Sequence, residues 1–78
     1  MVKRVRFYVY STDGLTGLYI KVWRKKPEGF CLMGCSENIR GDLLSGQINT
    51  VDLADPIVNV REGDYYGCRI EKSGGGFP

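Results

Sequence analysis

Residues 18–24, LYIKVWR, are the stretch that determines the fold class of this chain. Three apolar side chains alternate strictly with aromatic or cationic ones, namely Leu18, Ile20 and Val22 with Tyr19, Lys21 and Trp23. A repeat of two residues is the period at which side chains of a β-strand point to opposite faces, whereas a helix repeats every 3.6 residues. The stretch therefore predicts a strand with one apolar face and one aromatic, cationic face.

Similar segments occur on both sides of this stretch. Residues 2–10 alternate in the same way, with Val5, Phe7 and Val9 on one face and Arg4, Arg6, Tyr8 and Tyr10 on the other. Further strands are predicted over 30–36, 47–53, 57–60 and 65–71, with a helical turn near 39–44. Turns are predicted over 11–17, 26–29 and 61–64, which are rich in Gly, Pro and Asp. A break is predicted at Asp55-Pro56.

Five or six short strands without a long helix predict a small all-β fold. We expect an antiparallel, jelly-roll-like β-sandwich, and a small five-stranded barrel is the alternative. One domain is predicted over residues 1–72, followed by a flexible glycine-rich tail over 73–78. A chain of 78 residues buries only about 60 % of its unfolded surface, so dimerisation is expected to complete the fold.

The composition argues against catalysis. The chain has no histidine, which is the commonest general base and metal ligand. Its carboxylates do not follow the spacing of a calcium loop and are interpreted as solvated turn residues: Asp52, Asp55, Glu62 and Asp64. We therefore predict a protein that is not an enzyme and has no cofactor or metal site. No apolar run has the length of a membrane span, so no membrane partner is predicted.

The chain has three cysteines, Cys31, Cys35 and Cys68. In a regular strand Cys31 and Cys35 lie on one face, and at about 3.3 Å per residue their Cα atoms are roughly 13 Å apart. That distance is too long for a disulfide. Three buried, reduced thiols are expected. A disulfide from Cys31 or Cys35 to Cys68 stays open as an alternative, and the cellular compartment of the protein stays open with it. Residues 1–6 are basic and lack the apolar core of a signal peptide, which leaves a cytoplasmic protein or a piece of a longer one.

If residues 2–10 pair with 18–24, their polar sides form one surface. The candidate ligand-binding residues on it are Arg4, Arg6, Tyr8, Tyr10, Tyr19, Lys21 and Trp23, with Lys25 and Lys26 just beyond. Three interpretations stay open. Aromatic rings and cations bind single-stranded nucleic acid, Trp and Tyr rings stack on sugars, and aromatic and Arg side chains are also typical of interfaces with another sheet or a second copy.

Residues 53–67, LADPIVNVREGDYYG, resemble a strand–turn–strand pattern, "pI-x-V-x-x-GD-x-x-G", of β-sandwich modules in large extracellular animal proteins. Residues 6–10, 19–24 and 30–34 resemble earlier strands of such modules, so the similarity covers about residues 5–70. The resemblance implies an extracellular, jelly-roll-like module for adhesion or ligand binding. Such modules have further strands before the first one here, so the resemblance implies a truncated fold or one completed by dimerisation. It brings no catalytic residues.

Together these observations predict a non-catalytic binding or interaction module. Its expected ligand is a carbohydrate or a protein, and its expected partner is a second copy or a neighbouring domain. A nucleic-acid-binding barrel is the alternative function. The net charge of +2 is too small to imply a polyanion partner by itself.

Overall fold

The computed structural model describes residues 1–73, and residues 74–78 of the predicted tail lie outside the described part. The elements follow the order β1 (Val2–Val9), β2 (Leu15–Lys26), β3 (Gly29–Cys35), η1 (Arg40–Asp42), β4 (Gln47–Ile57) and β5 (Tyr65–Lys72). Apart from the single 3-10 turn η1, every element is a strand. The predicted all-β class is confirmed.

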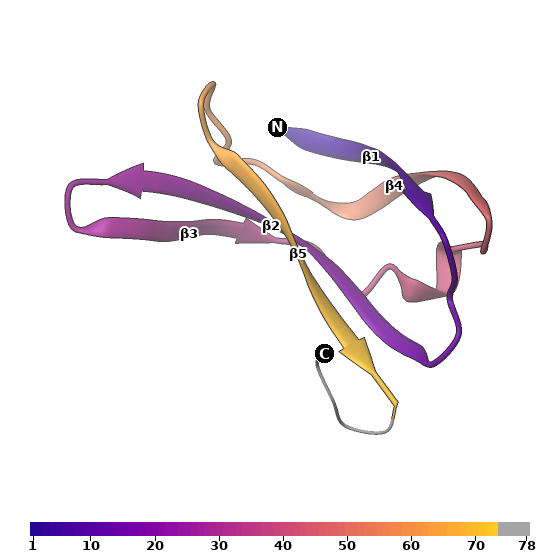
Figure 1. The fold of residues 1–78 in the computed structure, drawn as a ribbon. Helices are drawn as coiled ribbons and strands as arrows, with labels where there is room; N and C mark the ends of the chain where they lie inside the picture. The colour runs from indigo at the N-terminus through magenta and orange to yellow at the C-terminus, as the bar shows by residue number, and fades with distance from the viewer. Residues whose placement is uncertain (74–78) are drawn as a thin grey trace.

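The strands form two antiparallel sheets (Figure 1). Strand β1 pairs with β4, and β2 lies between β3 and β5. Within residues 1–73 the strands do not close into a barrel, so the sandwich, and not the barrel alternative, describes the fold. The hairpin of β2 and β3 projects beyond β1 and β4 on the left of Figure 1.

The pairing of the first two strands differs from the prediction. Strand β1 pairs with β4, so residues 2–10 and 18–24 belong to different sheets. The two strands carry complementary charges on their outer face, where Arg4 of β1 lies opposite Asp52 of β4. Nε of Arg4 donates to Oδ1 of Asp52 at 2.5 Å. An alternating pattern identifies a strand and its two faces, but it does not identify the neighbour in the sheet.

The core lies between the two sheets. Its buried apolar side chains are Val2, Val9, Leu18, Ile20, Val22, Ile39, Leu43, Val51, Leu53 and Ile57. Val22 at the centre of β2 and Ile39 beside η1 are almost fully enclosed. Burial of one such side chain stabilises the fold by about 1.5–3 kcal/mol. The apolar face predicted for residues 18–24 is therefore the face that packs inward.

Strand β4 continues through Asp55-Pro56 to Ile57, although a break was predicted there, and no separate strand forms over 57–60. The pairing is irregular at this point, because Val2 lies opposite Ile57 while Arg4 lies opposite Asp52. A proline, which has no N–H, is accommodated where a ladder is irregular. The continuation brings Ile57 into the core.

Strand β3 contains a β-bulge that changes the predicted position of two cysteines. Trp23 lies opposite Leu32, whereas the adjacent Val22 lies opposite Gly34, so β3 has one extra residue. An extra residue reverses the faces of the residues that follow it. The prediction that Cys31 and Cys35 share a face is therefore wrong.

The thiols themselves are free, as expected, but they are not all buried. Cys31 is half-buried, and Cys35 and Cys68 are exposed. Cys35 lies opposite Lys21, whose side of the sheet faces away from the core, whereas Cys68 lies opposite the buried Ile20.

Candidate binding face

The structure separates the predicted site residues into two groups. Those of β2, Tyr19, Lys21 and Trp23, lie on the outer face of the three-stranded sheet, because the residues between them are buried. Those of β1, Arg4, Arg6 and Tyr8, lie on the outer face of the two-stranded sheet. Tyr10 follows the end of β1 and is exposed. Since the sheets pack through their inner faces, the two groups point to opposite sides of the molecule.

The outer face of the two-stranded sheet is partly neutralised. The hydrogen bond from Arg4 lowers the pKa of Asp52, and the same bond raises the pKa of Arg4. Arg6 lies opposite Thr50, and Tyr8 lies opposite Ile48. This face therefore offers one tyrosine beside an aliphatic side chain, and Arg6 forms no ion pair within residues 1–73.

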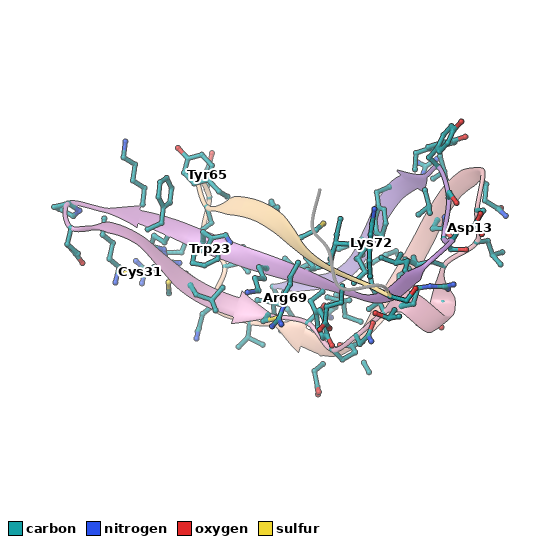
Figure 2. The ribbon with its side chains drawn as sticks, turned by 60° about the horizontal axis from the view of Figure 1, so that its bottom comes forward. Asp13, Trp23, Cys31, Tyr65, Arg69 and Lys72 are labelled. Carbon is teal, nitrogen blue, oxygen red and sulfur yellow. The ribbon has the colours of Figure 1, made fainter. Side chains whose placement is uncertain are left out.

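The outer face of the three-stranded sheet is richer in aromatic side chains. In the strand register, Leu32 of β3 and Tyr65 of β5 lie on either side of Trp23, and Phe30 lies opposite Lys25. Trp23 and Tyr65 lie at the same end of the sheet in Figure 2. We call Trp23, Phe30 and Tyr65, which come from three different strands, the aromatic cluster.

The three rings of the aromatic cluster line one shallow hollow of about 410 Å³. The rings of Phe30 and Tyr65 meet edge to face, with centroids 5.5 Å apart at 80°. Trp23 lies beside Gly67, where an added Cβ would be 3.6 Å from the indole Nε1. Phe30 and Tyr65 are 58 % and 53 % exposed. Covering exposed apolar surface of this kind with a ligand is favourable, because it removes that surface from water.

Charges are distributed unevenly along this face. At the aromatic cluster, the Lys21 ammonium lies 5.7 Å from the centroid of the Trp23 ring, a cation–π contact. Towards the other end, Arg69 lies 5.8 Å from the centroid of Tyr19 and 3.7 Å from the Glu71 carboxylate. Glu71, as a hydrogen-bond acceptor, raises the pKa of the Tyr19 hydroxyl. The aromatic cluster therefore lies at the more positive end of the face.

Sequence reasoning identified part of this site. Lys21 and Trp23 are among the predicted residues, whereas Phe30 and Tyr65 were placed in strands and given no role. The two-residue turn between Lys26 and Gly29 was a usable signal for Phe30, because it brings Phe30 opposite Lys25. No local signal brings Tyr65 to Trp23, since that contact depends on the pairing of β5 with β2.

The carboxylates do not gather into a site. Asp52 pairs with Arg4, and Asp64 pairs with Arg24. Among residues 1–73, no group of three or more His, Cys, Asp or Glu side chains is placed to hold a metal ion. None of the described helical structure is long and apolar enough to cross a membrane.

Comparison with protein families, with curated proteins and with solved structures finds no match to this chain. The resemblance to extracellular β-sandwich modules therefore stays a prediction.

Proposed function

We propose that this chain is a non-catalytic binding module that holds a carbohydrate on the aromatic cluster of its three-stranded sheet. The observation that supports the proposal is the meeting of Trp23, Phe30 and Tyr65, from three strands, around one exposed hollow. Small-molecule sites are typically concave and apolar, with a few polar groups that orient the ligand. The cluster has this composition.

The chemistry of the hollow suits a sugar ring. The C–H face of a pyranose is apolar and stacks on an aromatic ring, while its hydroxyls lie at the ring edge. Tyr and Trp combine an apolar ring with a polar group that bonds to such hydroxyls. The ammonium groups of Lys21 and Lys25 lie on the same face, and within residues 1–73 neither takes part in an ion pair. The preferred sugar therefore carries a carboxylate or a sulfate.

Single-stranded nucleic acid is the second candidate, because lysines beside aromatic rings also bind phosphates and bases. Nucleic acid requires a positive track that follows several nucleotides. Here the track is short, since Glu71 lies beside Arg69 at the other end of the face. The geometry therefore favours a compact ligand over a long strand.

The test is calorimetric titration with heparin fragments, uronic-acid oligosaccharides and neutral oligosaccharides. We expect Tyr65→Ala to weaken binding by about tenfold or more, which corresponds to about 1.4 kcal/mol. Tyr8→Ala is the matched control, because Tyr8 is similarly exposed but lies on the opposite side of the molecule. Its affinity should equal that of the wild type.

Two results would contradict the proposal. One is the absence of binding to every saccharide class, and the other is an equal loss in the Tyr8→Ala variant. Retention of single-stranded DNA that falls steeply with salt would instead support the second candidate.

A further inference from the structure

Strand β5 leaves its inner face uncovered. Tyr66, Cys68 and Ile70 lie opposite Val22, Ile20 and Leu18 in the register. Opposite residues of paired strands point to the same side of a sheet, so these three side chains point to the side of the core. Yet Tyr66 is 62 % exposed, and Cys68 and Ile70 are also exposed. The two-stranded sheet covers β2 but does not reach across β5.

An apolar groove of about 270 Å³ lies along this uncovered strip. Val5 and Phe7 of β1 line one wall, Tyr66 and Cys68 of β5 line the other, and Ile20 of β2 lies between them. The groove is separate from the aromatic cluster, because none of Trp23, Phe30 and Tyr65 lines it. Arg6 of β1 also lines the groove.

The edge of β1 that borders the groove is unpaired. Within residues 1–73, β1 pairs only with β4, and β1 is the strand that lines the groove. Its second edge therefore presents backbone N–H and C=O groups that pair with another strand when one is available. An uncovered apolar strip and an open strand edge thus lie side by side, and an extended chain matches both.

We propose that the groove binds an extended peptide segment that adds to β1 as a third strand of the smaller sheet. Every second side chain of the segment is apolar and covers Tyr66, Cys68 and Ile70. Strand addition of this kind draws its affinity from main-chain hydrogen bonds and its specificity from alternate side chains. The inference does not depend on carbohydrate binding at the aromatic cluster.

Charge complementarity indicates the other side chains of the segment. They lie beside the outer row of β1, where Arg4 is already paired with Asp52. Arg6 lies opposite Thr50 and forms no ion pair within residues 1–73. Opposite charges on neighbouring strands are favourable, so the outward side chains of the segment are acidic.

A second copy of the chain fits this position less well. A copy that paired its β1 with this β1 would be related by a two-fold axis, and its β5 would lie beneath the joined sheet. Strand β5 of the first copy already extends beneath that position. A separate strand avoids the collision.

The test uses the exposed Cys68 thiol as a reporter in a variant with Cys31→Ser and Cys35→Ser. The probe is a peptide of alternating valine and glutamate, as long as the 8 residues of β1. With the peptide at about ten times its Kd, alkylation of Cys68 should slow by about tenfold, because only the free protein reacts. Amide hydrogen exchange in β1 should slow as well.

Variants separate the groove from the remaining surface. Tyr66→Glu should abolish the protection, whereas Tyr10→Glu, at an exposed tyrosine beyond the end of β1, should leave it unchanged. Arg6→Glu should weaken binding of the glutamate peptide and strengthen binding of a matched lysine peptide. Arg6 is exposed, so this exchange tests the proposal even if Tyr66→Glu fails to fold.

Two outcomes would overturn the proposal. The first is unchanged Cys68 reactivity and β1 exchange at every peptide concentration. The second is a dimer, seen by light scattering, in which Cys68 is already protected without peptide, because this would assign the groove to a second copy.

Discussion

At the scale of single residues, the ion pair between Arg24 and Asp64 holds the loop between β4 and β5 against the β2–β3 hairpin. Nε and Nη2 of Arg24 donate to the two carboxylate oxygens of Asp64, each at 2.9 Å. Nη2 also donates to the carbonyl of Asn59, and the Arg61 N–H donates to Asp64. Only 4 % of the Asp64 side chain is exposed, so solvent competes little for these bonds.

This pair predicts a loss of stability in acid. The hydrogen bond from Arg24 holds the pKa of Asp64 below its ordinary value of 3.8. A carboxylate with a lowered pKa stabilises the fold above its unfolded pKa, and this contribution is lost as the pH falls through the folded pKa. Asp64→Asn should therefore lower the urea midpoint at pH 7, and its difference from the wild type should shrink below about pH 4.

The matched control for this prediction is Glu62→Gln, in the same turn. No ion pair or side-chain hydrogen bond of Glu62 occurs among the described residues. We expect its urea midpoint to stay close to that of the wild type throughout the pH series. A difference between Asp64→Asn and the wild type that stays constant from pH 7 to about pH 2 would contradict the role assigned to the pair.

At the scale of elements, the bulge in β3 determines which thiols react. It places Cys35 on the outer face opposite Lys21, and Cys31 opposite Arg24 on the inner side. Cys68 is exposed, yet partial desolvation of its side chain raises its pKa, which reduces its thiolate fraction near neutral pH. Alkylation of the native wild type should therefore modify Cys35 first, by several-fold over Cys31 and Cys68, and peptide mass spectrometry measures the order. Equal rates for Cys31 and Cys35 would show that the bulge does not separate them.

The strands also show how far the sequence specifies the fold. Alternation predicted the strands, because it records which side chains are buried, and the inward side of β2 was assigned correctly. Pairing was not predictable, because it joins residues that are far apart in the sequence, such as Arg4 and Asp52, 48 residues apart. In the candidate site, too, the residues of one strand were predictable, and those brought in by strand pairing were not. Lys21 and Trp23 share a strand, whereas Tyr65 reaches them only through the sheet.

At the scale of the whole molecule, the two sheets approach each other closely where Ile57 of β4 lies over Gly34 of β3. A Cβ at Gly34 would collide with Cγ2 of Ile57. The backbone φ of Gly34 is not in the positive range, so its conformation does not require glycine. Glycine is needed here because a side chain would not fit between the two strands. The spacing between the sheets therefore depends on the absence of one methyl group.

This contact predicts a specific coupling between the sheets. Gly34→Ala should destabilise the fold by about 1–3 kcal/mol through overpacking, and Ile57→Ala by about 2–5 kcal/mol through loss of buried volume. In the double variant the alanine methyl at 34 occupies part of the space that Ile57 leaves. Its cost should therefore be smaller than the sum, by about 0.5–3 kcal/mol. Urea unfolding of the four proteins measures this coupling.

A second glycine provides the control. Gly41 in η1 has open space around an added Cβ, and its φ is not positive. Gly41→Ala should leave the stability unchanged or raise it by up to about 1 kcal/mol, because alanine restricts the unfolded chain. If the losses in free energy of unfolding from Gly34→Ala and Ile57→Ala simply add, the two side-chain positions do not touch. That result would contradict the face-to-face packing of the sheets at this point. A coupling confined to residues 34 and 57 would instead show that β3 and β4 pack against each other at this point. The open side of the sandwich is then the side formed by β1 and β5.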